Sequence, residues 1–278
     1  LALAKAGDGA VAGATLPEGF FNFFTTPQDI ISGLGWGLGY FGMPHIIIRF
    51  MSLKSEKELR KSSVIGISWT TIILIMSALT AVAGRLYLGE IDDPSTVFIT
   101  MVRRIFPALV SGLLLSAILS AAMSTADSQL LAASSAFASD VYKPVIRKKA
   151  SDSEMLWAGR IVVIVIAVVA LMIASDPNSG SIMGLVENAW GVFGAAFGPV
   201  ILLSLFWKRL TFGGTVAGIA AGAAVDILWL VFLSSTDIYE IVPGFAAGLL
   251  AAVVVSLLSK GPGKDVEDLF DRAVDLKS

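Results

Sequence analysis

Long apolar stretches separated by short polar segments dominate the pattern along this chain. A bilayer core about 30 Å thick is crossed by about 20 apolar residues in a helix. Seven stretches are long enough, at residues 28–51, 63–88, 107–140, 157–175, 181–206, 211–233 and 241–259. We therefore expect an all-α integral membrane protein. The third stretch is longer than a perpendicular helix needs, so we expect it to tilt or to leave the membrane at one end.

Three segments outside these stretches complete the expected organisation. Residues 94–106 space their apolar side chains at helical intervals beside Arg103 and Arg104, which predicts a short amphipathic helix on the outer face. Residues 1–27, with the aromatic run Phe20-Phe-Asn-Phe-Phe24, are expected to form an extracytoplasmic loop that touches the membrane interface. Residues 28–259 then form a seven-helix membrane domain, and residues 260–278 a cytoplasmic tail with a solvated or surface-resting helix.

Composition agrees with a membrane protein and excludes several other classes. Hydrophobic residues make up 55% of the chain and charged residues 15%, against about 25% charged in soluble domains. A net charge of −2 offers no basic excess for nucleic acid. Without cysteine and with only His45, the chain has no thiolate or histidine metal centre. No nucleophile, base and orienting group stand together, so we expect neither an enzyme nor a cofactor.

The distribution of lysine and arginine predicts the orientation, because cytoplasmic loops carry the excess of both. Sixteen of the twenty fall on one side of the predicted spans: Arg49, Lys54, Lys57, Arg60, Lys61, Lys143, Arg147, Lys148, Lys149, Arg160, Lys208, Arg209, Lys260, Lys264, Arg272 and Lys277. We therefore expect the first span to run from outside to inside and the C-terminus to be cytoplasmic. The expected location is the cell membrane, with the bilayer as partner.

The first span has a sequence that suits a continuous helix poorly. Five glycines lie between Gly33 and Gly42, and Pro44 follows. Broken helices of this kind form mid-membrane substrate sites in secondary transporters, because their free backbone groups meet ions and charged groups. Trp36, Tyr40 and Pro44 recur every four residues and should share one stripe. Alternatively, the glycines allow tight helix packing and the aromatic residues fill a core; spacing leaves both interpretations open.

The third span contains hydroxyl side chains on one helical face. Ala121, Ser124, Thr125 and Ser128 follow the i, i+3, i+4, i+7 spacing. Hydroxyls and backbone carbonyls can bind a hard cation such as sodium. Hydroxyls in membrane helices also bond to neighbouring helices or to their own preceding turn, and the pattern by itself favours this ordinary role.

Several ionisable residues stand inside the predicted spans. Asp127 lies near mid-membrane, where a carboxyl is costly and faces the bundle interior or water. With Ser128 it is a candidate for an ion path, or it pairs with a basic residue. Glu187 and Asp226 raise the same question, although Glu187 is near the outer end and is expected to be hydrated. His45 is expected to be a structural hydrogen-bonding residue rather than a proton relay.

Two segments resemble a known family. Residues 35–48, from Gly35-Trp-Gly-Leu-Gly to His-Ile-Ile-Ile48, followed by Arg49-Phe-Met51, resemble the seventh helix of sodium/proline symporters of the solute:sodium symporter family. Ala121-Ala-Met-Ser-Thr125 resembles their ninth helix. The resemblance implies that the seven spans are helices seven to thirteen of a thirteen-helix protein. Its fold would be the LeuT-like arrangement of two inverted five-helix repeats, of which this chain is the C-terminal part.

The resemblance also implies site residues. Ala121 through its carbonyl, and Ser124 and Thr125 through their hydroxyls, match the sodium-binding positions. Trp36, Tyr40 and Pro44 match positions that shape the proline site. Met43 stands where the proline carriers have glutamine. This difference weakens the expectation that proline is the substrate more than the expectation of coupling to sodium. The remaining sodium ligands of the family belong to its second helix, which this chain lacks, so we expect that the chain alone does not transport.

The expected function is sodium-coupled symport of a small solute, with L-proline first, sodium as coupling ion and alternating access as mechanism. A relative that carries pantothenate, an organic acid or a sugar is the nearest alternative. A transporter-like sensor domain of a signalling protein is a second one. A kinase or receiver domain after the last span would identify that class, and about eighteen residues follow Lys260.

Overall fold

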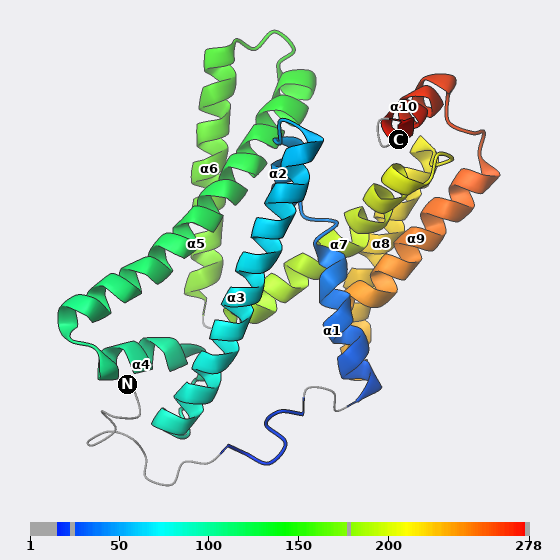
Figure 1. The fold of residues 1–278 in the computed structure, drawn as a ribbon. Coiled ribbons are helices and arrows are strands. Elements are labelled where there is room, and N and C mark those ends of the chain that lie inside the picture. The colour runs from blue at the N-terminus through cyan, green and yellow to red at the C-terminus, as the bar shows by residue number, and fades with distance from the viewer. Residues whose placement is uncertain (1–15, 23–25, 177–178, 276–278) are drawn as a thin grey trace. The chain divides into compact units, whose positions relative to one another are not determined.

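The described part of the chain is helical apart from short connections. A computed structural model describes residues 16–22, 26–176 and 179–275, in which no strand occurs. The helices are α1 Pro27–Gly39, α2 Pro44–Met51, α3 Glu56–Leu88, α4 Val97–Ile105, α5 Ala108–Ala136, α6 Asp152–Ser175, α7 Ile182–Phe206, α8 Phe212–Phe232, α9 Ile241–Leu258 and α10 Lys264–Asp275 (Figure 1). Two 3-10 turns, Pro94–Thr96 and Ser234–Thr236, and a π-helix, η3 at Phe137–Ile146, complete the list. The predicted all-α class is confirmed.

Six helices in the described part are long and apolar enough to cross a membrane. They are α3, α5 together with η3, α6, α7, α8 and α9, which correspond to the second through seventh predicted spans. The first predicted span, 28–51, differs. It contains two short helices, α1 with 13 residues and α2 with 8, because the helix stops at Gly39 and restarts only at Pro44.

The chain divides into two compact units, which we describe separately. One contains residues 52–163, with α3, α4, α5, η3 and the start of α6, together with the described part of segment 1–23. The other contains residues 164–275, with the rest of α6 and α7–α10, together with α1 and α2. Much of the predicted loop 1–27, part of its aromatic run, and the last residues of the tail lie outside the described residues.

The amphipathic helix predicted between residues 94 and 106 is present as α4, which packs against the end of α3. A Cβ at Gly84 of α3 would lie 2.3 Å from a Val97 methyl group, so the glycine lets α4 come close. The buried Ser111 hydroxyl of α5 donates to the carbonyls of Val102 and Phe106, at 3.0 and 3.1 Å. The helix is therefore fixed to the spans on both of its sides.

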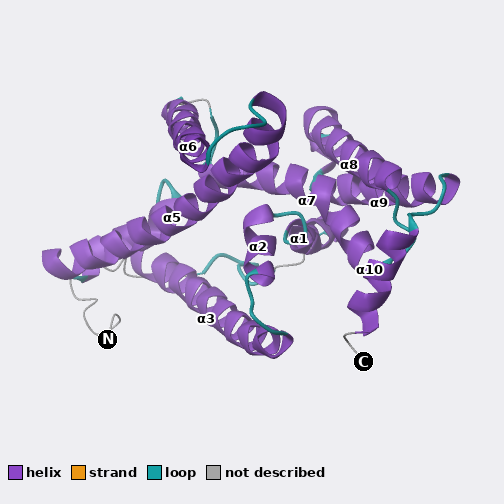
Figure 2. Cartoon of the chain, turned by 90° about the horizontal axis from the view of Figure 1, so that it is seen from above, coloured by secondary structure: helices purple, strands orange, loops and turns teal. Residues whose placement is uncertain are grey.

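Helices α7, α8 and α9 pack along their lengths and form the core of the second unit (Figures 1 and 2). Small residues recur every four positions on the buried faces of α8 and α9: Gly214, Gly218 and Gly222 on α8, and Gly244, Gly248, Ala252 and Ser256 on α9. A Cβ at Gly222 would lie only 2.1 Å from the carbonyl oxygen of Ala195 in α7. Small residues let membrane helices approach this closely.

At one end of this three-helix core, the buried polar groups satisfy one another. The Thr211 amide and hydroxyl lie 3.2 and 3.3 Å from the Ser256 hydroxyl, and the Gly214 amide donates to the Thr211 hydroxyl at 3.1 Å. Beyond this end, Lys208 pairs with Asp271 of α10, which holds the last helix against the α7–α8 connection. The hydrogen bond to Asp271 raises the pKa of Lys208 above its ordinary value.

Candidate functional site

The break between α1 and α2 is stabilised by contacts with α7. The last carbonyls of a helix have no partner within it. Here the Trp190 indole N–H of α7 donates to the Trp36 carbonyl at 3.0 Å, and the Gly42 amide donates to the Gly39 carbonyl at 3.0 Å. The break is therefore a packed part of the protein.

The glycines of this region have two different roles. A Cβ at Gly39 would lie 1.9 Å from the Trp190 indole nitrogen, and one at Gly42 would lie 2.2 Å from the Phe193 carbonyl oxygen. Both glycines therefore allow backbone contact with α7. Gly33 and Gly37 have no atom within 4 Å of the position of a Cβ. The structure shows both the expected break and tight packing at some of its glycines, and the role of the break in binding substrate stays a prediction.

An aromatic cluster surrounds the end of α1. The Trp36 ring lies 5.5 Å from Tyr239 and 6.2 Å from Trp190, and Tyr40 meets Trp190 edge to face at 4.8 Å. Tyr239 is buried and its hydroxyl donates to the Glu187 carbonyl at 2.8 Å, whereas Tyr40 is 56% exposed. Sequence reasoning missed Trp190 and Tyr239, since residues that far from Trp36 along the chain give no spacing signal.

Pro44, the third predicted substrate residue, lies on a different helix from Trp36. It is exposed and begins α2, so the break removes the helical period that would have aligned it with Trp36 and Tyr40. Both Trp36 and Tyr40 contact Trp190. Met43, just before Pro44, is buried. The four-residue spacing therefore brings two of the three residues to one neighbour.

The predicted sodium residues lie on α5, and most of them are exposed. Ala121, Ser124, Thr125 and Asp127 are exposed and Ser128 is half-buried. The Thr125 hydroxyl donates to the Ala121 carbonyl at 3.3 Å, and Ser128 donates to the Ser124 carbonyl at 2.9 Å. These are the bonds to a preceding turn that the ordinary interpretation expects. They also place the Thr125 and Ala121 oxygens side by side.

The two predicted sites fall in different compact units. Trp36, Tyr40 and Pro44 belong to the unit with α7–α9, and Ala121 to Ser128 belong to the unit with α3–α5. Within the described residues, no group of three histidine, aspartate or glutamate side chains could hold a metal ion.

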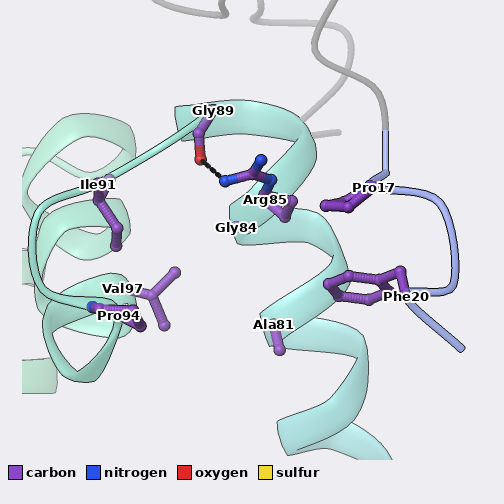
Figure 3. Close-up of a pocket in the computed structure, with 9 residues that line it drawn as sticks. All are labelled: Pro17, Phe20, Ala81, Gly84, Arg85, Gly89, Ile91, Pro94 and Val97. Atoms are coloured by element: carbon purple, nitrogen blue, oxygen red, sulfur yellow. Dashed lines mark hydrogen bonds between the residues drawn. The ribbon is translucent and has the colours of Figure 1, made fainter. Parts of the chain in front are cut away.

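A pocket of about 320 Å³ lies at the end of α3, away from the predicted sodium residues (Figure 3). Its lining is Pro17, Phe20, Ala81, Gly84, Arg85, Gly89, Ile91, Pro94 and Val97. Arg85 is the only charged lining residue, and it is already bonded to the Gly89 carbonyl and to Glu90 at 3.4 and 3.0 Å. The pocket is therefore an apolar hollow between α3 and α4, without oxygen ligands suited to sodium.

The three acidic residues noted in the spans have different surroundings. Asp127 is exposed on α5, Glu187 is half-buried on α7, and Asp226 on α8 has no exposed surface. A further acid, Glu240 at the start of α9, is also buried. Sequence reasoning did not select Glu240, because it stands just outside the predicted span.

Comparison with known proteins identifies similar sequences over nearly the whole chain. The profile of the sodium:solute symporter family matches residues 7–222. The high-affinity proline transporter PutP of Bacillus subtilis (strain 168) is 43% identical over 98% of this chain and 59% of its own length. The osmoregulated proline transporter OpuE of the same organism is 45% identical over 87% of this chain and 50% of its own length.

A third relative, the sodium/proline symporter of Haemophilus influenzae, is 45% identical over 94% of this chain and 55% of its own length. The chain thus spans about half the length of the curated relatives it matches. No solved structure matches it.

Proposed function

This chain belongs to the sodium:solute symporter family, and we propose that it supplies one side of the sodium site and of the substrate site of a sodium-coupled L-proline symporter. The observation that carries this proposal is the break between α1 and α2, at which an exposed Tyr40 ring meets Trp190. The similarity to relatives named as proline transporters supports proline as the substrate.

On the substrate side, Trp36 and Tyr40 shape the wall of the site and Pro44 ends the break. The aromatic cluster gives the pyrrolidine ring of proline an apolar surface, while free backbone groups of a broken helix can bind a carboxylate or an ammonium group. The Trp36 carbonyl is already bonded to Trp190, so this carbonyl positions the helix rather than binding substrate. Tyr40 is the contact residue that the geometry favours.

On the sodium side, the Ala121 carbonyl and the Ser124 and Thr125 hydroxyls are the proposed ligands. The bond from Thr125 to Ala121 sets two oxygens side by side, and a hydroxyl that donates to a carbonyl still has a lone pair free for a cation. Asp127 and Ser128 extend this polar face as the proposed ion path. Coupling then requires that sodium bind the substrate-loaded, outward-open state more tightly than the inward-open state.

The proposed orientation places the positively charged connections and the C-terminus in the cytoplasm, and the connections after α3 and α8 outside. We also propose that the helices of this chain belong to a LeuT-like inverted-repeat core. The charge distribution and the broken first segment support these two statements.

Uptake of labelled L-proline by cells expressing the full-length protein tests the proposed function. We expect uptake that requires an inward sodium gradient and is abolished when potassium replaces sodium. Excess unlabelled proline should compete. Sodium-dependent uptake of pantothenate, an organic acid or a sugar that proline does not inhibit would overturn the assignment of proline as substrate but not the coupling to sodium. Met43, which stands where the proline carriers have glutamine, is the reason to test these other solutes.

A further inference from the structure

A carboxyl group occupies a place in the α8 packing stripe where small residues otherwise stand. Gly214, Gly218, Gly222 and Asp226 recur every four residues on the buried face of α8. Asp226 has 0% of its surface exposed, and neither of its carboxyl oxygens has a hydrogen-bond partner. A buried polar group without a partner is costly, so its presence at this position requires a physical reason.

A second buried carboxyl lies beside the first. Glu240 is 8% exposed and its Oε1 has no hydrogen-bond partner. Asp226 Oδ1 and Glu240 Oε1 lie 3.1 and 3.3 Å from a single point, the position that a Cβ would take on Gly191 of α7. Gly244 of α9 also packs closely against Asp226, since a Cβ on Gly244 would lie 2.8 Å from that of Asp226. The two carboxyls therefore face one small space enclosed by α7, α8 and α9.

In the described part of the chain, neither of these carboxyls forms an ion pair with a basic side chain. Glu187 on α7 and Tyr239 before α9 are the other titratable groups nearby, and the Tyr239 hydroxyl donates to the Glu187 backbone carbonyl. The three ion pairs found among the described residues involve other acids. Two ionised carboxylates buried without a counter-charge would repel each other and lose their hydration.

A proton resolves this conflict better than a metal ion. A hard cation prefers about six oxygen ligands, whereas the space offers three carboxyl oxygens without partners and Asp226 has no surface open to water. A proton needs only one oxygen to carry it and one to accept a hydrogen bond. Burial, and then the charge of Glu187, raise the pKa of Glu240, which is consistent with a protonated pair.

We propose that Asp226 and Glu240 form a proton-binding site inside the α7–α9 core, in which one carboxyl is protonated at neutral pH and donates a hydrogen bond to the other. The proton comes from solvent when the helices pack together and returns to solvent when they separate. This site is distinct from the proposed sodium and substrate residues, and none of those residues is needed to form it.

Proton binding makes the stability of the core depend on pH with a defined sign. In the unfolded chain, both carboxyls release their protons above about pH 4. The folded core retains one, so the equilibrium constant for unfolding should rise roughly tenfold for each pH unit above about pH 4, until the folded pair releases its proton. Stability therefore falls as pH increases through this window.

The test is thermal unfolding of the full-length protein in detergent, from about pH 5 to about pH 8, in potassium buffer. We expect the wild-type midpoint to fall with rising pH and Asp226→Asn, which mimics the protonated carboxyl, to remove most of this fall. Asp237→Asn is the matched control, because Asp237 is an exposed carboxyl in the connection between α8 and α9. It should follow the wild type.

Infrared spectroscopy supplies a second measurement that does not depend on a variant folding. The wild type at neutral pH should show a carboxylic-acid carbonyl band that is absent from the double variant Asp226→Asn, Glu240→Gln. The proposal would be overturned if the unfolding midpoints of the wild type, Asp226→Asn and Asp237→Asn changed equally with pH. It would also be overturned if the wild type showed no carboxylic-acid band. Stabilisation of the wild type by sodium at about pH 8, lost in Asp226→Asn, would assign the site to sodium instead. Solute uptake enters neither measurement, so the result is independent of the proposed symport.

Discussion

At the scale of single residues, the proposed sodium ligand Thr125 makes the same hydrogen bond as a threonine to which no sodium role is assigned. Thr125 donates to the Ala121 carbonyl one turn back, and Thr71 of α3 makes the same bond to the Ile67 carbonyl at 2.8 Å. Both threonines are exposed. The geometry of one side chain therefore does not separate a sodium ligand from an ordinary membrane threonine, and a comparison of the two residues can.

We expect Thr125→Ala to raise the sodium concentration for half-maximal uptake about fivefold, since losing one oxygen contact worth about 1 kcal/mol weakens binding by about that factor. Thr71→Ala removes the same type of hydrogen bond elsewhere and should leave the sodium dependence unchanged. Uptake at graded sodium concentrations, with expression measured in parallel, checks both. Equal behaviour of the two variants would argue against a sodium ligand at Thr125.

At the scale of elements, the interrupted segment from α1 to α2 is fixed by its neighbour as much as by its own composition. Gly39 and Gly42 contact α7 through positions that no larger residue could occupy, while Gly33 and Gly37 face open space. Trp190 adds the hydrogen bond to Trp36. The break thus persists because α7 provides both the room and the donor that it requires.

Substitution of two glycines in this segment tests that view. Gly42→Ala should destabilise the protein by about 1–3 kcal/mol, because the added methyl group would overlap the α7 backbone. Gly37→Ala should be neutral or stabilising by up to about 1 kcal/mol, because alanine is the better helix former and meets no atom there. Thermal unfolding in detergent measures the difference.

A stability loss of similar size in both variants would contradict this assignment of roles. If the break also shapes the substrate site, uptake should be lower in Gly42→Ala than in Gly37→Ala.

At the scale of the whole molecule, the spans differ in the share of their residues that other parts of this chain bury. The apolar windows of α3 and α6 contain no buried residue, whereas α7 has 39% of its window buried and α9 has 33%. The α7–α9 group therefore makes its own core. The sides of α3 and α6 that are apolar and uncovered are available to lipid or to other helices.

The absence of cysteine from this chain makes its orientation directly testable. In a full-length protein with any other cysteines removed, Ser151→Cys should react with a membrane-impermeant maleimide only from the cytoplasmic side. Ser95→Cys and Ser235→Cys should react from the outside, because the loops rich in lysine and arginine stay in the cytoplasm. All three serines are exposed. Labelling of Ser151→Cys and Ser95→Cys from the same side would refute the predicted topology.

The sequence by itself determined the all-helical class, six of the spans with ends that differ from the helix bounds by up to seven residues, and the family. These features depend on local properties: a run of apolar residues must be helical to satisfy its backbone in lipid, whatever its neighbours are. The motif around Gly35 to Arg49 and the Ala121–Thr125 motif are likewise contiguous. For such features, the order of residues is sufficient.

Only the tertiary structure decided which side chains meet. No spacing along the chain indicated that Trp190 would contact both Trp36 and Tyr40, or that Tyr239 would lie beside Trp36. Asp226 reads in sequence as one more acid in a span, and becomes a buried carboxyl beside Glu240 only when α7, α8 and α9 pack. Contacts between distant residues depend on helix packing, and no local periodicity encodes the partner.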